Sequence, residues 1–199
     1  MSDLSLSSSP GAPLFSLRFE DALRFAATSH EGQTRRASET PYVQHVVAVA
    51  WILGRSGFGE DVVIAGLLHD VVEDTAVTIE EVAARFGPVV ADLVERCSEI
   101  KNDATGRMRP WIDRKRDHLA ALADAPVEAR AVILADKIHN LTSIEYDLSL
   151  GRDVWPAFHA DRAEVLWYYQ AILDCCGRDD PRLERLSACC REILARVSL

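Results

Sequence analysis

The stretch Val62-Val63-Ile64-Ala65-Gly66-Leu67-Leu68-His69-Asp70-Val71-Val72-Glu73-Asp74 changes character at its centre. Its first seven residues are apolar on every face of a helix, which is typical of a helix buried in a protein core. The next six contain a histidine and three carboxylates, although burying an unpaired carboxylate is costly. The polar end of this stretch therefore indicates that a cationic group lies against these carboxylates. An ordinary charge cluster at a helix–loop junction is the alternative.

The spacing of the polar residues in this stretch pairs them. His69 and Glu73 are four positions apart, and so are Asp70 and Asp74. On a continuous helix, residues four apart share a face. The sequence therefore predicts that two residues of metal-ligand type lie one turn from two residues of acid–base type.

Two other predicted helices carry residues of the same kind. Asp136 and Asn140, again four apart, follow an apolar run, and His45 borders the apolar stripe of an earlier helix. Taken alone, Asp136 fits a salt bridge to Lys137 equally well, and a single histidine is more often structural. Two imidazoles and two carboxylates from buried helices, however, suit Mn²⁺, Fe²⁺ or Zn²⁺ with positions open for water and substrate. The four are His45, His69, Asp70 and Asp136.

The remaining sequence is helical in pattern nearly throughout, and alternation typical of strands is absent. Ser16 is a candidate N-cap, and Thr78 with Glu81 forms a capping-box pattern. The sequence predicts an all-α bundle of about nine helices in one domain, residues 16–199, after a flexible tail, residues 1–15. The predicted helices cover about 17–30, 42–54, 60–73, 78–87, 88–100, 111–123, 126–150, 155–176 and 181–197.

Composition restricts the class of protein. The 199 residues carry a formal net charge of −9, whereas general binders of nucleic acid or anionic membranes are normally basic. No apolar run approaches the roughly 20 residues that span a bilayer, and the N-terminus lacks the pattern of a signal peptide. Five cysteines, an odd number, favour reduced thiols. We expect a cytoplasmic protein with no nucleic-acid or membrane partner, and a homo-oligomer is left open.

One segment is locally basic. Residues 101–116 contain six Lys or Arg against Asp103 and Asp113, a net of +4 in an acidic protein. A solvated loop and helix face explains this charge as well as a phosphate-binding surface does, although arginines bind phosphates bidentately.

The four ligand-type residues, His45, His69, Asp70 and Asp136, resemble those of the HD-domain metal-dependent phosphohydrolases, whose ligands follow the order His…His-Asp…Asp. The surrounding strings are similar to the hydrolase domain of the Rel/SpoT enzymes, and especially to the stand-alone small alarmone hydrolases. The strings are His30-Glu31-Gly32-Gln33-Thr34-Arg35-Arg36, Pro41-Tyr42-Val43-Gln44-His45, Leu67 to Thr75, and Ala135-Asp136-Lys137-Ile138-His139-Asn140-Leu141.

The resemblance implies an all-α HD domain that removes the 3′-diphosphate from the guanosine alarmones ppGpp and pppGpp, using Mn²⁺. It also implies a role for each matching residue. His45, His69, Asp70 and Asp136 would hold the metal, and Glu73 and Asp74 would manage the attacking water and the proton transfer. Arg36 would pack on the guanine, and Tyr42, Lys137, Asn140 and Ser143 would line the nucleotide pocket.

Two other functions fit the same sequence. One is an HD phosphohydrolase of another phosphorylated nucleotide. The other is a regulatory protein, such as an antitoxin partner of an alarmone synthetase. The sequence does not indicate which of Glu73 and Asp74 is the acid and which is the base.

Overall fold

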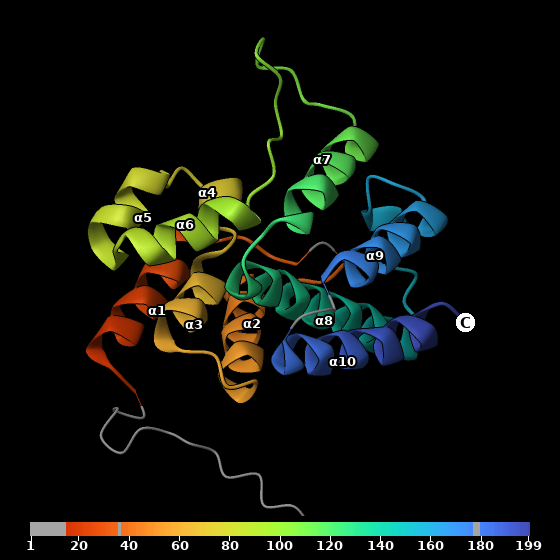
Figure 1. The fold of residues 1–199 in the computed structure, drawn as a ribbon. Helices are drawn as coiled ribbons and strands as arrows, with labels where there is room; N and C mark the ends of the chain where they lie inside the picture. The colour runs from red at the N-terminus through yellow and green to blue at the C-terminus, as the bar shows by residue number, and fades with distance from the viewer. Residues whose placement is uncertain (1–14, 36, 177–179) are drawn as a thin grey trace, which may run out of the picture.

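Helix α8 (Val127–Ser149) is the element against which most of the other helices pack (Figure 1). Its residues 131–135 are all buried, and it contacts α2, α3, α6, α9 and α10. A helix that is apolar around its whole circumference must be covered on all sides. In this computed structural model, the described residues are 15–35, 37–176 and 180–199, so nearly all of the predicted tail and Arg36 lie outside them.

The described part of the chain is all-α, as predicted, with two isolated β-bridges, Thr34–Pro41 and Asn102–Met108, in its loops. None of its helices is long and apolar enough to cross a membrane. Besides α8, the α-helices are α1 (Leu17–Ser29), α2 (Val43–Arg55), α3 (Glu60–Leu68), α4 (Val71–Asp74), α5 (Ile79–Phe86), α6 (Pro88–Cys97), α7 (Trp111–Ala123), α9 (Arg162–Cys176) and α10 (Pro181–Val197).

Local sequence signals explain where several helices begin. The Ser16 side chain accepts a hydrogen bond from the Phe19 N–H and caps α1. Thr78 and Glu81 form the predicted capping box of α5, in which each side chain satisfies the other residue's backbone N–H. The predicted helix over 155–176 is a short 3₁₀ turn (Trp155–Ala157) followed by α9, which begins only at Arg162.

The prediction of one continuous helix over residues 60–73 is wrong. The chain turns at His69 and Asp70, which separate α3 from α4. His69 Nδ1 lies 2.8 Å from the Gly66 carbonyl oxygen, the group that a continuing helix would offer to the Asp70 N–H. His69 and Asp70 therefore lie at the end of a buried helix, although the Asp74 N–H still bonds to the Asp70 carbonyl.

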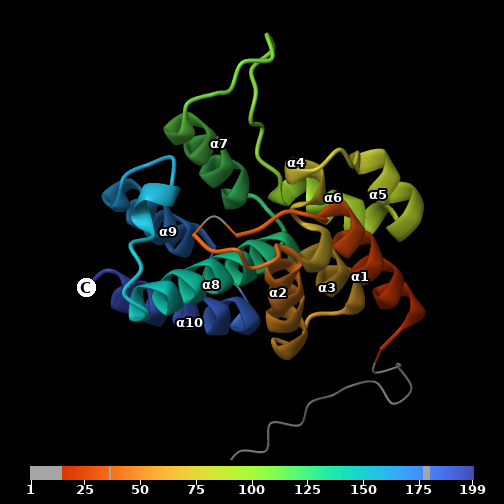
Figure 2. The same ribbon diagram turned by 180° about the vertical axis from the view of Figure 1, so that it is seen from behind.

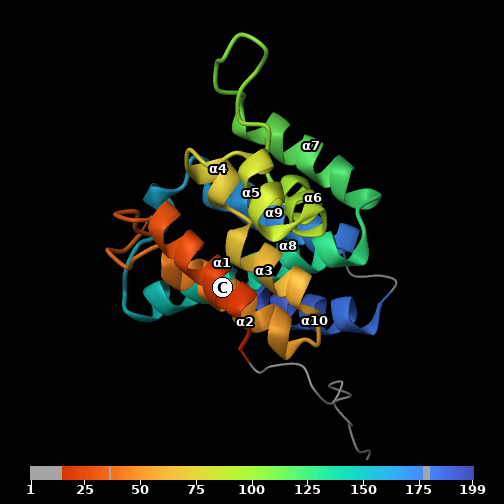
Figure 3. The ribbon, with the colours of Figure 1, turned by 90° about the vertical axis from the view of Figure 1, so that its left-hand side faces the viewer.

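The connection between α6 and α7 extends beyond the helices, as the views from behind and from the side show (Figures 2 and 3). Near the start of this connection, Glu99 and Lys101 lie against the body of the protein, where both contact Glu73. This connection therefore brings a polar segment against α4.

Helices α2 and α3 are in close contact at Gly66. A Cβ atom added there would lie 2.3 Å from Leu53 Cδ1 and 3.3 Å from Val49 Cγ1, and both side chains are fully buried. Only glycine lets α3 approach α2 this closely, and α3 carries His69 at its end.

We expect Gly66→Ala to lower the free energy of unfolding by about 1–3 kcal/mol, because overpacking the α2–α3 contact outweighs the gain in helix propensity. Chemical denaturation measures this change. Gly54→Ala is the matched control, since its Cβ would meet only Val63 at 3.9 Å on an exposed part of α2, and it should be neutral or stabilising. Equal stability of the two variants would contradict the packing argument.

Candidate functional site

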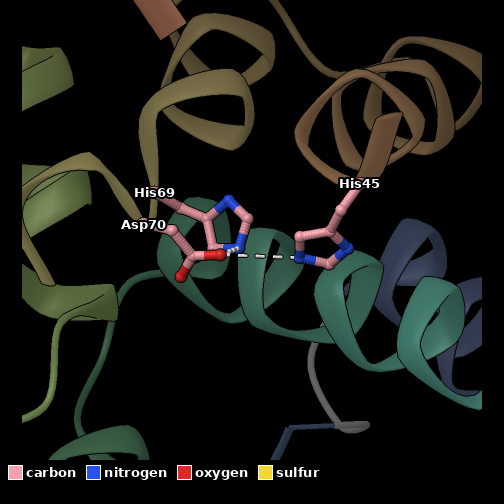
Figure 4. A group of neighbouring side chains, drawn as sticks. All are labelled: His45, His69 and Asp70. Atoms are coloured by element: carbon pink, nitrogen blue, oxygen red, sulfur yellow. Dashed lines mark ion pairs between the residues drawn. The ribbon is translucent and has the colours of Figure 1, made fainter. Parts of the chain in front are cut away.

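Three segments that are distant in the sequence bring the predicted ligand residues together. His45 comes from α2, His69 and Asp70 from the turn after α3, and Asp136 from α8. Figure 4 shows the His45 and His69 rings on either side of one oxygen of the Asp70 carboxylate, which forms ion pairs with both. The structure thus places the four predicted ligand residues next to one another.

The facing atoms are the two Nε2 nitrogens and one oxygen of each carboxylate. His45 Nε2 lies 3.2 Å from Asp136 Oδ1 and 3.5 Å from Asp70 Oδ2. His69 Nε2 lies 3.0 Å from Asp70 Oδ2 and 3.8 Å from Asp136 Oδ1. His45, His69 and Asp70 each offer a ligand atom close enough to the other two to share one metal ion.

The surroundings of His69 fit a divalent cation at this point. Because a carbonyl oxygen only accepts hydrogen bonds, the contact with Gly66 places a proton on Nδ1 and directs Nε2 toward the carboxylates. Nε2 is buried and, within the described part of the chain, makes no hydrogen bond of acceptable geometry, even with Asp70 at 3.0 Å. Burial alone would lower the pKa of His69, but the carboxylates of Asp70 and Asp136 raise it well above its ordinary value.

Other side chains hold each of these residues in place. The Tyr42 hydroxyl donates to Asp70 Oδ2 at 2.6 Å. Lys137 Nζ and Asn140 Nδ2 each lie 2.5 Å from an Asp136 oxygen, so Asp136 makes the salt bridge considered for it and still faces the histidines. His139 lies behind His45, with 2.7 Å between their Nδ1 atoms, and burial lowers the pKa of His139 to about 4.

The acidic pair lies beside this cluster on α4. Lys101 Nζ is 3.2 Å from Glu73 Oε1 and 2.6 Å from Asp74 Oδ1, and the Glu99 N–H donates to Glu73 Oε2 at 3.1 Å. Burial, reinforced by the nearby negative Asp70, raises the pKa of Glu73 despite Lys101. Glu73 is therefore the member of the pair whose surroundings favour a bound proton.

A cavity of about 250 Å³ opens onto these residues. All the predicted site residues line it except His45, which is 1% exposed, and Arg36, which lies outside the described residues. The predicted nucleotide-pocket residues on its wall are Tyr42, Lys137, Asn140 and Ser143.

Sequence reasoning missed several residues of this wall. Arg35, the neighbour of the predicted Arg36, lines the cavity, bonds to Asn140 Oδ1 and lies over the Tyr42 ring at 5.5 Å. The adjacent arginines were the available signal, but the sequence does not indicate which of them faces inward. Tyr168 and Tyr169 of α9 are buried and also border the cavity.

Comparison with known proteins gives a consistent result. Residues 22–155 match the family model of the HD domain. The chain is 37% identical over 139 residues to the Drosophila melanogaster guanosine-3′,5′-bis(diphosphate) 3′-pyrophosphohydrolase MESH1, covering 68% of this chain and 74% of that protein. It is 40% identical over 127 residues to human MESH1, covering 62% of this chain and 68% of that one.

A longer relative and a solved structure are also similar. The chain is 38% identical to the rice protein named probable GTP diphosphokinase RSH3, chloroplastic, over 64% of this chain but only 18% of that protein. A structure described as a metazoan ortholog of SpoT that hydrolyzes ppGpp superposes with a TM-score of 0.77 at 30% identity, covering 92% of this chain and 97% of that chain.

We expect divalent-metal binding to release protons and to strengthen as the pH rises. Without metal, the raised pKa of His69 keeps its Nε2 protonated, so a metal ion must displace that proton. At pH values below the folded pKa of His69, affinity should increase about tenfold per pH unit. Isothermal titration in buffers of different ionisation enthalpy measures both quantities.

The control for this measurement is His159→Gln, an exposed histidine on the rim of the cavity, which should release the same number of protons. Metal affinity that is independent of pH, with no proton release, would contradict the arrangement described for His69.

Proposed function

Because the chain belongs to the HD-domain family, we propose that it is a metal-dependent hydrolase that converts ppGpp or pppGpp to GDP or GTP and pyrophosphate. One observation carries the proposal: two imidazoles and two carboxylates converge beside an acidic pair, and all of these residues except the buried His45 line a single cavity. The similarity to fly MESH1 over about three quarters of that enzyme supports the choice of substrate.

HD domains use a divalent metal, and we propose Mn²⁺ as the ion in this chain. His45, His69, Asp70 and Asp136 would hold it, because their nitrogen and oxygen atoms face a common point. Two nitrogens and two carboxylate oxygens also suit Fe²⁺ and Zn²⁺. When bound, the ion supplies Lewis acidity for the water and the phosphoryl oxygen.

The reaction delivers a proton to the leaving ribose 3′ oxygen and removes a proton from the attacking water. Water attacks the phosphorus that is bonded to the ribose 3′ oxygen, the bond to that oxygen breaks, and pyrophosphate forms. We assign the proton donor for the ribose oxygen to Glu73, because burial and Asp70 raise its pKa. Asp74, held by Lys101, is left to accept a proton from the water.

The nucleoside would occupy the wall formed by α2 and α8. Tyr42, Asn140 and Ser143 line this part of the cavity. Lys137 also lines the cavity and bonds to Asp136. Arg36 remains our candidate for stacking on the guanine, and Arg35 is a second candidate because it already lies over an aromatic ring. We also propose that residues 16–199 act as one domain in the cytoplasm, as a homo-oligomer or as single chains.

We expect about one divalent ion per purified chain and release of pyrophosphate from ppGpp with Mn²⁺. Asp70→Asn should lose both the metal and the activity, since an amide replaces a carboxylate ligand. Elemental analysis and a pyrophosphate assay measure these effects, with Asp113→Asn on the exposed face of α7 as the control. Turnover of ppGpp by metal-depleted wild type would refute the mechanism, and turnover of another nucleotide in its place would refute the substrate.

We expect Glu73→Gln to lower kcat by about 10²–10⁴, the range for loss of general acid–base catalysis, and to leave the metal content near wild type. Glu80→Gln, an exposed residue in the first turn of α5, is the control and should have wild-type kcat. Steady-state kinetics of the three proteins decide the question. A kcat for Glu73→Gln within about threefold of wild type would remove Glu73 from the chemistry.

A further inference from the structure

The inner face of α7 carries two largely covered cations that share one carboxylate. Arg114 Nη1 lies 3.1 Å from Glu99 Oε2, and Lys115 Nζ bonds to Glu99 Oε1. The three side chains are 10%, 15% and 7% exposed, respectively. Within the described residues, the ion pairs of Arg114 and Lys115 all go to Glu99, so the group retains an excess positive charge. An excess charge away from water is costly unless an anion meets it.

Two nitrogens on the same face of α7 have no hydrogen-bond partner among the residues that the structure describes. Arg114 Nε and His118 Nε2 are buried without a hydrogen bond, and the two residues are four apart on the helix. The other ring nitrogen of His118 lies 2.6 Å from the Tyr168 hydroxyl. Because a guanidinium nitrogen only donates, Arg114 Nε requires an acceptor that these residues do not supply. Arg114, Lys115 and His118 all line the cavity of the proposed active site.

The group formed by Arg114, Lys115 and His118 on α7 adjoins the catalytic end of this cavity. Glu99, which holds both cations, donates its N–H to Glu73 Oε2. Lys137, bonded to Asp136, lies 5.6 Å from the centre of the Tyr168 ring, and Lys115 lies 4.6 Å from the same centre. An anionic molecule with one group at the predicted metal ligands therefore meets a second, cationic region, formed by α7, in the same cavity.

We propose that Arg114, Lys115 and His118 form a subsite for a phosphate group of the substrate other than the one attacked by water. This inference rests on the proposed function, which supplies a substrate with two diphosphates. The phosphate is either the terminal one of the 3′-diphosphate or one of the 5′ phosphates. Guanidinium and ammonium groups with unmet donors are the usual means of binding a phosphate dianion.

The rest of the basic segment provides the contrast. Arg116, two residues away on α7, is exposed, and Arg109 forms an ion pair with Asp117 outside the cavity. A purely structural role for Arg114 would consist of its bond to Glu99. In that case its loss would lower stability and leave anion binding unchanged.

The first test uses inorganic phosphate and the metal-loaded protein. We expect Arg114→Gln to weaken phosphate binding about 10- to 100-fold in isothermal titration, as for loss of a charge-assisted hydrogen bond, and to leave Tm within a few degrees of wild type. Arg116→Gln is the matched control and should bind phosphate like wild type. Unchanged phosphate affinity in Arg114→Gln, with or without a lower Tm, would overturn the subsite.

The second test identifies the phosphate. Three compounds are compared: ppGpp, guanosine 5′-diphosphate 3′-monophosphate, and guanosine 3′-diphosphate without 5′ phosphates. Arg114→Gln should raise KM for ppGpp about 10- to 100-fold with a smaller change in kcat. The variant and wild type should differ least on the compound that lacks the phosphate held by α7.

An equal loss on all three compounds would overturn the proposal, because Arg114 would then act on the attacked phosphate or on the nucleoside. If none of the three is hydrolysed by wild type, the proposed function fails. The titration with inorganic phosphate still decides in that case whether α7 binds phosphate.

Discussion

Two imidazoles and two carboxylates are buried where α2, α8 and the end of α3 meet, and each pair stabilises the other. Burial would raise the pKa of Asp70 and Asp136, but His69 and His45 hold the pKa of Asp70 well below its usual range, and Lys137 with the two histidines does the same for Asp136. The carboxylates in turn raise the pKa of His69. Removing one partner would leave an unpaired buried charge, which is strongly destabilising. The arrangement of the surrounding helices is built around this mutual dependence.

The fold maintains the cluster through contacts outside it. The close approach at Gly66 sets the distance between α2 and α3, and the Gly66 carbonyl orients the His69 ring. His139 and Tyr42 support His45 and Asp70 from behind, and Gln33 ties the loop before α2 to the Asp74 carbonyl at 2.8 Å. Such supporting contacts orient metal-ligating residues and tune their basicity.

Much of the fold could be predicted because periodicity and end signals act locally. Ser16, Thr78 and Pro181 begin helices as expected, and the four ligand-type residues converge because each follows or borders an apolar run that must be buried. The turn at His69 could not be predicted, since it depends on a bond between a side chain and a carbonyl that periodicity does not encode. Nor could sequence distinguish Arg114 from Arg116, because their burial depends on which face of α7 meets α9.

The segment that joins α6 to α7 links the two ends of the cavity through very few atoms. Glu99 holds the cations of α7, and Lys101, two residues later, holds the acids of α4. Two peptide units span no more than about 7.6 Å between Cα atoms. Covalent geometry therefore places an upper limit on how far apart Glu99 and Lys101 can move, and with them the contacts they make to α7 and α4. A displacement of this segment would alter the cations of α7 and the acids of α4 together.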